Sequence, residues 1–174
     1  KYLFCMTITV DKLCFLMSFG HCGIDWLHSL LDSHPQLLTP PAFSPYRNWK
    51  LLEAHKTTNV EDMHRLWFDY LTGPEMQGKD SRFFYTENET DVFNKKFYAN
   101  LKKKGFSRLQ VILSILDAYA EARGMDSNQI RSVILHEHVC YPFYEMLKDI
   151  KNPKVLMIAR DPRAAIAGYF KGMN

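Results

Sequence analysis

The sequence predicts an α/β fold, in which a parallel β-sheet is flanked by helices and the middle of the chain is helical. Three short apolar runs lie at residues 15–19, 132–135 and 154–159, and helical patterns separate them. The runs are apolar on both faces, as in strands of a sheet that helices cover on both sides. With 174 residues, 47% of them hydrophobic, the chain can bury one sizeable core, so we expect a single domain over residues 1–174.

The first expected strand, Phe15–Phe19, ends at Gly20, where the apolar run stops. A helix should follow, because Asp25 is a suitable N-cap and the residues after it have helical periodicity. Pro35 ends this helix, and three prolines in seven residues make 39–45 a loop. The apolar face of the helix consists of Trp26, Leu27, Leu30 and Leu31.

Three helices are expected in the middle of the chain, at residues 59–70, 92–101 and 107–122. The segment 72–82 is rich in glycine and charged residues, which favours a loop. The third helix has the clearest pattern, since its apolar residues recur every three or four positions. They are Leu109, Ile112, Leu113, Leu116 and Tyr119.

The last third of the chain returns to alternating strands and helices. A β-branched run predicts a strand at Ser132–Leu135, and a helix is expected at Pro142–Ile150. The third strand, Lys154–Ala159, leads through Asp161-Pro162 into a helix that begins at Arg163.

Composition narrows the classes of function. A net charge of +3 suits a small anionic ligand but does not predict nucleic-acid binding. No apolar run approaches the ~18–20 residues that span a bilayer, and the first twenty residues lack the pattern of a signal peptide. The cysteines, whose spacing fits neither a zinc site nor a C-x-x-C pair, suggest buried free thiols in a reducing, cytoplasmic compartment. They are Cys5, Cys14, Cys22 and Cys140.

The stretch "FLMSFGHCGIDWLHSLLDSHP" has the order strand, glycine turn, helix. Such a turn can hold an anion, because free backbone N–H groups and the positive end of the helix dipole point at one place. The alternative is an ordinary strand–helix turn in which glycine only permits the tight geometry. The P-loop string of Gly, four residues and Gly-Lys-Ser/Thr is missing, so the sequence does not favour a kinase that uses ATP.

This stretch resembles the 5′-phosphosulfate-binding segment of sulfotransferases that use 3′-phosphoadenosine 5′-phosphosulfate (PAPS). Gly23 matches the central glycine of that segment, and "LLDSHP" matches the end of its helix. The resemblance implies a P-loop-like sheet whose turn holds the phosphosulfate, mainly through backbone N–H groups. The cofactor-binding positions are Gly20, His21, Cys22, Gly23, Ile24 and Asp25.

Four of these positions depart from the family pattern. His21 stands where the family has Lys or Arg, and it can stabilise charge on the leaving phosphate only when protonated. Cys22 stands for a serine. Ile24 and Asp25 replace two hydroxyl residues, and a carboxylate at position 25 repels phosphate unless it turns back to cap its own helix.

The stretch "VLMIARDPRAAIAGYF" resembles the second phosphate segment of the same family, in which a strand is followed by Arg-Asp-Pro-Arg and a helix. Arg160 matches the arginine that holds the 3′-phosphate. Gly168 stands where the family has a serine, and Arg163 with the helix N-terminus is expected to compensate in part. The alternative is that Arg160 pairs with an acidic neighbour and that "DPR" only starts a helix.

Transfer of a sulfuryl group needs a general base, because the acceptor loses a proton as its bond to sulfur forms. The family places this base after a strand that precedes the Arg-Asp-Pro segment, and "ILHEHVCYP" occupies that place. We favour His138, with Glu137 and His136 as rivals. Alternation along a strand puts Glu137 on the face opposite to both histidines. The alternative is that the three are polar residues at a sheet end with no role, and no further ligand cluster points to a metal.

The resemblance therefore implies a sulfotransferase, with PAPS as co-substrate and a small-molecule or glycan hydroxyl or amine as acceptor. The alternative function is a catalytically inactive, sulfotransferase-like binding or assembly protein. Family members continue further, so we expect this domain to be short, incomplete at its C-terminus, or completed by an oligomer or a partner chain. The aromatic residues between 83 and 98 are candidates for the acceptor pocket or, more simply, for the core.

Overall fold

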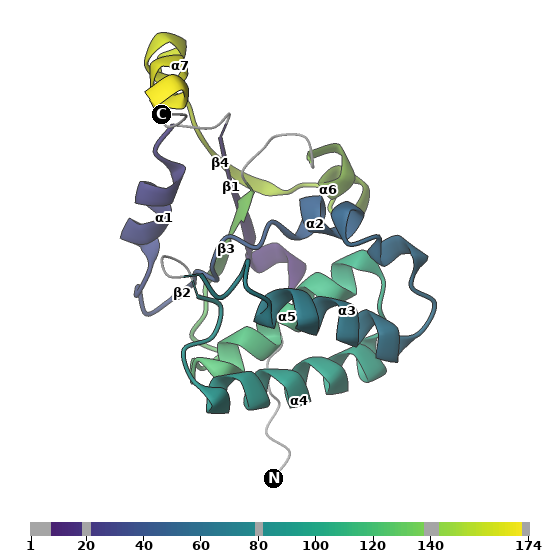
Figure 1. Cartoon of the computed structure of the whole chain (residues 1–174). Helices are drawn as coiled ribbons and strands as arrows, with labels where there is room; N and C mark the ends of the chain where they lie inside the picture. The colour runs from purple at the N-terminus through teal and green to yellow at the C-terminus, as the bar shows by residue number, and fades with distance from the viewer. Residues whose placement is uncertain (1–7, 19–21, 79–81, 138–142, 172–174) are drawn as a thin grey trace.

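The computed structural model describes residues 8–18, 22–78, 82–137 and 143–171. They form a four-stranded, all-parallel sheet with the strand order β2-β3-β1-β4, flanked by helices. Figure 1 shows α1 on the left of the sheet and α2 and α6 on its right. The α/β class predicted from the sequence is confirmed. The strands are β1 (Leu13–Ser18), β2 (Leu37–Leu38), β3 (Ser132–Glu137) and β4 (Lys154–Ile158).

Strand β1 lies in the middle of the sheet and pairs with β3 and β4 at once. Leu16 of β1 is the register partner of His136 in β3 and of Leu156 in β4. Residues 15–17 are at most 1% exposed, because neighbouring strands cover both edges of β1 and packed side chains cover both faces. The continuous apolar run in the sequence reflects this burial on two sides.

Seven α-helices and two short 3₁₀ turns occupy the described residues. Their bounds are α1 (Ile24–Leu31), α2 (Pro45–Leu51), α3 (Val60–Thr72), α4 (Glu87–Lys104), α5 (Arg108–Ala122), α6 (Phe143–Asp149) and α7 (Pro162–Lys171), with η1 (Val10–Lys12) and η2 (Ala54–Lys56). Helix α2 was not predicted from the sequence. It starts at the end of the proline-rich loop, and Pro45 suits its first turn because an N–H is not needed there.

Helix α4 begins at Glu87, well before the predicted helix start at residue 92. Thr86 and Glu89 form a capping box: the Thr86 hydroxyl accepts from the Glu89 N–H, and the Glu89 carboxylate accepts from the Thr86 N–H. This polar first turn has no apolar stripe, so periodicity alone placed the helix start too late.

The main core lies on the face of the sheet opposite α1. Phe15 and Met17 of β1 and Val133 and Leu135 of β3 belong to it. Four phenylalanines between positions 83 and 97 are no more than 5% exposed and pack against one another in this core. For these four residues the simpler alternative, a core role and not an acceptor pocket, is confirmed. They are Phe83, Phe84, Phe93 and Phe97.

One buried carboxylate fixes the start of the described chain to this core. Asp117 of α5 is 8% exposed and accepts a hydrogen bond from the Ile8 N–H at 2.6 Å. Its other oxygen accepts from the Lys104 ammonium group, also at 2.6 Å. Because both oxygens are satisfied, burial of this charge is tolerated.

Two of the three crossover connections leave the sheet in opposite directions. The connection from β1 passes through α1 and crosses β3 to reach β2, whereas the connection from β3 passes through α6 and crosses β1 to reach β4. Right-handed crossovers therefore place α1 and α6 on opposite faces, and the two clusters of buried residues agree. In open α/β sheets, ligands bind at the carboxyl ends of two adjacent strands whose following connections run to opposite faces of the sheet. In this sheet those two strands are β1 and β3.

Strand β4 is an edge strand with apolar side chains exposed on both faces. Val155, Leu156 and Met157 are 36%, 43% and 49% exposed. Among the described residues, Cys14 and Cys22 are half-buried thiols without a disulfide. None of the helices in the described part of the chain has both the length and the hydrophobicity that a bilayer span requires.

The N-cap of α3 offers a direct test of this fold. The Asn59 side chain accepts from the Asp62 N–H at 2.8 Å, so Asn59→Ala should lower the free energy of unfolding by about 1 kcal/mol in urea denaturation. Thr58→Ala, one residue outside the cap and exposed, is the matched control and should change stability little. Equal midpoints for the two variants would contradict this assignment of the cap.

Candidate functional site

The predicted site residues leave the sheet at its carboxyl edge. Ser18 of β1 is the register partner of Ile158 in β4, and Met17 is the partner of Glu137 in β3. Arg160 follows soon after Ile158, and Ser18 is the last residue of β1 before the segment that leads to α1. The sheet therefore brings the turn, the end of β3 and the Arg-Asp-Pro segment to one edge. The predictions for three site residues fall outside the described residues; these are Gly20, His21 and His138.

The turn before α1 contains a position that requires glycine. Gly23 has a φ of +88°, in the left-handed region, and is the N-cap of α1. The first helical hydrogen bond runs from the Leu27 N–H to the Gly23 carbonyl, and glycine has no side chain to cap the helix. The N–H groups of residues 24–26 therefore have no partner within the helix, as an anion site of this kind needs. Cys22, just before Gly23, is half-buried.

The prediction that Asp25 caps α1 is wrong. The helix begins at Ile24, so Asp25 lies inside its first turn and not at the cap. Its side chain is 79% exposed, and its Oδ1 lies 3.7 Å from Nδ1 of His136. Ile24 is only 3% exposed and belongs to a small cluster with Leu16 and Ile134 between α1 and the sheet. Its apolar side chain therefore anchors the helix start.

His136 and Glu137 lie on opposite faces of β3, as their alternation predicts. The His136 side chain is fully buried on the α1 side, where its ring centroid lies 5.3 Å from that of His28. The Glu137 side chain faces α2 on the other side of the sheet, where its Oε1 accepts from the Tyr46 N–H at 3.1 Å.

Glu137 is a buried carboxyl group with an altered acidity. The residue is 1% exposed, and this burial raises its pKa to about 8, against the opposing effects of the Tyr46 N–H and the Ser44 side chain. Its Oε2 has no hydrogen-bond partner among the described residues. Glu137 is therefore mainly protonated near neutral pH, and a protonated carboxyl group can donate a hydrogen bond but is a poor base.

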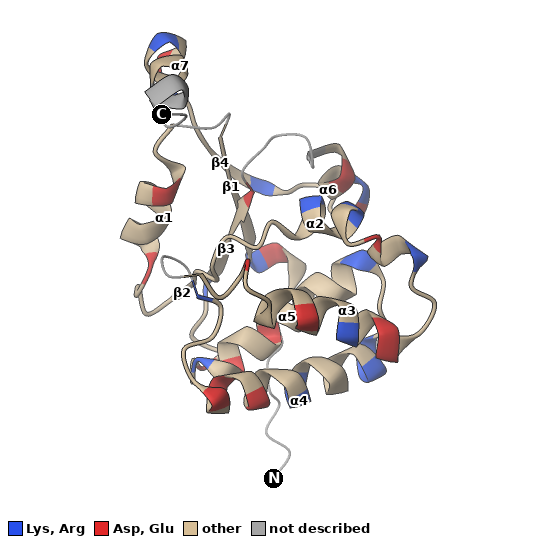
Figure 2. Cartoon of the chain, in the orientation of Figure 1, with Lys and Arg blue, Asp and Glu red and all other residues tan. Residues whose placement is uncertain are grey.

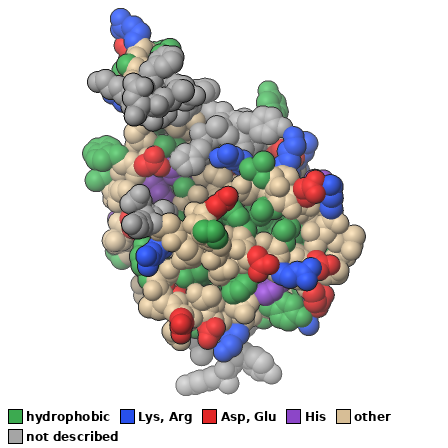
Figure 3. Space-filling view, viewed as in Figure 1, with side chains coloured by type: hydrophobic (Ala, Val, Ile, Leu, Met, Phe, Trp, Pro, Cys, Tyr) green, Lys and Arg blue, Asp and Glu red, His purple; other side chains and the backbone are tan. Residues whose placement is uncertain are grey.

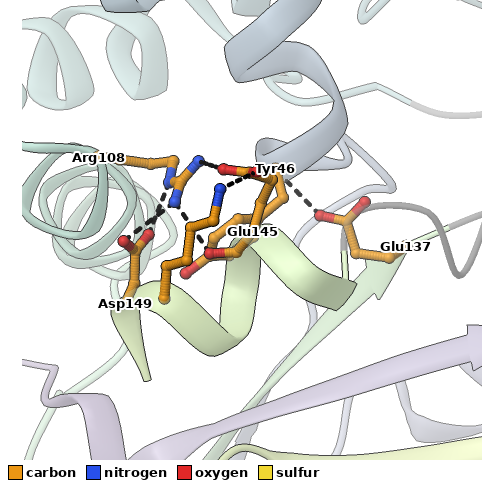
Figure 4. A network of polar contacts seen from close by, with 6 residues as sticks. Tyr46, Arg108, Glu137, Glu145 and Asp149 are labelled. Carbon is orange, nitrogen blue, oxygen red and sulfur yellow. Dashed lines mark hydrogen bonds and ion pairs between the residues drawn. The ribbon is translucent and has the colours of Figure 1, made fainter. Parts of the chain in front are cut away.

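A network of charged residues fastens α6 beside Glu137 (Figure 4). The Arg108 guanidinium of α5 bonds Asp149 at 2.6 Å and Glu145 at 2.7 Å, so α5 holds α6 near both of its ends. The same guanidinium lies 5.2 Å from the ring centroid of Tyr46, the residue whose N–H contacts Glu137. This network was not predicted from the sequence, although the i, i+4 spacing of Glu145 and Asp149 puts both carboxylates on one side of a helix.

The residues that connect β4 to α7 are exposed. Arg163 forms an ion pair with Asp161, 2.6 Å between the nearest atoms, and this contact lowers the pKa of the Asp161 carboxyl group. The Asp161 side chain also accepts from the Arg163 N–H at 2.9 Å, which supports the start of α7. Gly168 lies within α7, and Arg160 lies in the exposed segment before it.

A cavity of about 630 Å³ lies between α1, β2 and the end of α5. Asp25 and His136 line one part of it, whereas neither Cys22 nor Arg160 does. This cavity was not predicted from the sequence, because segments from residues 25 to 136 form its wall and no local pattern marks them. Since His136 is the last residue but one of β3, the cavity adjoins the carboxyl edge of the sheet.

Charged residues of both signs are spread over the helices in Figure 2, without a large basic face in that view. An anion at the carboxyl edge would thus be held by local groups rather than by a general positive field. Among the described residues, no three His, Cys, Asp or Glu side chains are grouped so that they could hold a metal ion.

Comparison with known proteins finds no matching family model, no matching curated protein and no matching solved structure. We therefore infer function from this chain's own residues and from the geometry that brings them together.

The raised pKa of Glu137 predicts a measurable pH dependence of stability. Between its ordinary value of 4.5 in the unfolded chain and its folded value of about 8, the folded protein keeps a proton that the unfolded chain has released. The free energy of unfolding should therefore fall with rising pH in this range, by up to ~1.4 kcal/mol per pH unit from this group.

Glu137→Gln removes this titration and keeps an acceptor for the Tyr46 N–H. Urea denaturation at pH 5, 6, 7 and 8 should show the variant gaining stability relative to the natural chain as the pH rises. Glu87→Gln, at an exposed helix start, is the control and should show no such trend. A constant difference between Glu137→Gln and the natural chain across these pH values would refute the burial argument.

Proposed function

We propose that this protein is a sulfotransferase that moves a sulfuryl group from PAPS to a hydroxyl or amine acceptor. The observation that carries the proposal is the parallel pairing of β1 with both β3 and β4. Because of this pairing, the two segments that resemble phosphate-binding segments, far apart in the sequence, start from neighbouring strands at the same edge of the sheet.

The 5′-phosphosulfate of the nucleotide would lie at the carboxyl end of β1, on the side of β3, and its 3′-phosphate would lie toward β4. The N–H groups at the start of α1 would hold the 5′-phosphosulfate, and the positive end of the helix dipole adds to them. Gly23 supports this role, because its left-handed backbone lets the chain turn sharply into the helix. Arg160 would hold the 3′-phosphate through charge-assisted hydrogen bonds.

The acceptor must lose a proton during transfer, and the end of β3 supplies the candidates for the base. Glu137 carries a proton near neutral pH, since burial raises its pKa to about 8. His136 is fully buried beside Asp25 and His28. We therefore keep His138, the next residue along the chain after these two, as the base.

A second function is favoured by two observations. Asp25 presents an exposed carboxylate in the first turn of α1, where it would repel a phosphosulfate, and β4 exposes apolar side chains on both faces. An edge strand of this kind can accept a strand from another chain. A binding or assembly protein that has lost catalysis, with an oligomer or a partner chain at β4, is therefore the alternative.

Titration calorimetry with adenosine 3′,5′-bisphosphate tests the nucleotide site. We expect binding, and Arg160→Ala should weaken it by about tenfold to a hundredfold, the effect of losing charged hydrogen bonds to a phosphate. Arg65→Ala, which removes an exposed arginine of α3 that pairs with Asp62 in the same helix, is the control and should bind as the natural chain does. If adenosine 3′,5′-bisphosphate does not bind to the natural chain, the proposal is refuted.

Transfer of labelled sulfur from PAPS to a panel of hydroxyl and amine acceptors tests the catalytic step. His138→Ala should reduce the rate by about 10²–10⁴-fold, as the loss of a general base does, and should leave nucleotide binding intact. His55→Ala, at an exposed 3₁₀ turn, is the control. Binding of the bisphosphate without transfer to any acceptor would instead support the inactive alternative.

A further inference from the structure

The cavity beside α1 has the size and position of an acceptor site. Its volume of about 630 Å³ lies within the ~300–1,000 Å³ of small-molecule sites. Asp25 at the start of α1 and His136 near the end of β3 line it, so part of the cavity adjoins the carboxyl edge where the phosphosulfate would lie. On its other side the cavity reaches Tyr85, before α4, and Arg123, after α5.

Among the described residues, the charges around the cavity nearly balance. This part of the wall holds three carboxylates, from Asp25, Asp32 and Glu75, and two guanidinium groups. One of these, Arg123, already pairs with the Glu89 carboxylate at 2.7 Å. The carboxylates would repel a polyanionic ligand, and the arginines would repel a polycationic ligand. The wall therefore favours a ligand without net charge. Figure 3 shows acidic, basic and histidine side chains following one another along the left side of the molecule, beside α1.

The wall is also rich in hydrogen-bonding groups. Hydroxyls of Ser29, Ser33 and Thr39 lie in it together with the charged side chains, and Asp32 accepts from the Thr39 hydroxyl at 2.9 Å. A large apolar ligand would bury such groups without partners, which costs free energy. A ligand with many hydroxyl groups can both donate to the carboxylates and accept from the guanidinium groups.

One exposed aromatic ring offers an apolar surface within this polar wall, whereas the ring of Tyr119, which also lines it, is only 6% exposed. Tyr85 is 61% exposed, and the Arg123 guanidinium lies 5.0 Å from its ring centroid, so a cation holds the ring in place. A ring held in this way can pack against the C–H face of a sugar. Polar groups around an exposed aromatic ring suit a pyranose better than a flat phenol or a flexible polyamine.

We propose that this cavity binds a neutral saccharide. Its role as the acceptor rests on the proposed function. In that reaction a saccharide hydroxyl oxygen bonds to the sulfur of PAPS, and the bond between sulfur and the bridging phosphate oxygen breaks. The hydroxyl proton passes to the base at the end of β3, and the products are a sulfate monoester and adenosine 3′,5′-bisphosphate.

Saturation-transfer NMR and calorimetry on the whole chain without nucleotide test the binding itself. The probes are the neutral disaccharides lactose and cellobiose, with 4-nitrophenol, spermidine and a sulfated heparin disaccharide as ligands of other chemistry. We expect binding of at least one neutral disaccharide, and weaker or no binding of the other three. Preference for any of those three, or no binding of either neutral disaccharide, would overturn the inference.

Two variants locate the binding in the cavity. Tyr85→Ala and Arg82→Ala should each weaken disaccharide binding about fivefold or more, since each removes an exposed side chain from the wall. Tyr98→Ala is the control for Tyr85→Ala, because Tyr98 also lies under a cation, Lys102, but is outside the cavity wall. Arg65→Ala is the control for Arg82→Ala. Equal effects of a variant and its control would place any binding elsewhere and refute the inference.

The result separates this inference from the proposed function. Disaccharide binding that depends on Tyr85, in a chain that does not bind adenosine 3′,5′-bisphosphate, would support the saccharide site and refute the sulfotransferase. Nucleotide binding that depends on Arg160, in a chain that binds no neutral disaccharide, would refute the saccharide site and leave the sulfotransferase standing.

Discussion

Strand β1 forms parallel hydrogen bonds with β3 on one side and β4 on the other, and the candidate site residues owe their position to this pairing. Parallel strands end at the same edge, so the glycine turn, Glu137 and the Arg160 segment meet there although long stretches of chain separate them. Any change that shifted the register of β1 by one residue would exchange the two faces of the strand and break both cores at once.

The two faces of this sheet give neighbouring residues different chemistry. His136 faces α1, beside an exposed aspartate and an open cavity, whereas Glu137 faces the main core and keeps its proton near neutral pH. Neighbouring residues of one strand therefore differ in environment: His136 lies near solvent-accessible polar side chains, whereas Glu137 is a buried acid that keeps its proton near neutral pH. The Arg108 network supports the second environment, because it fixes α6 and contacts the ring of Tyr46.

Much of the fold followed from short-range patterns, and the departures have local causes. Helices α3 and α5 were predicted within two residues because their apolar stripes face the core along their whole length. The start of α4 was missed because a capping box, not an apolar residue, opens it. Strand β2 has two residues, too few for any pattern, and only its pairing with β3 defines it.

Three features follow from the order of the amino acids alone: the class of fold, the glycine at the turn before α1, and the two segments that resemble phosphate sites. Apolar periodicity and turn chemistry act between residues close in the chain, so they can be recognised without a structure. The remaining features come from tertiary contacts. The order of the strands, the placing of Asp25 against His136, the burial that protonates Glu137 and the cavity beside α1 all depend on contacts between distant segments, and such contacts leave no local pattern.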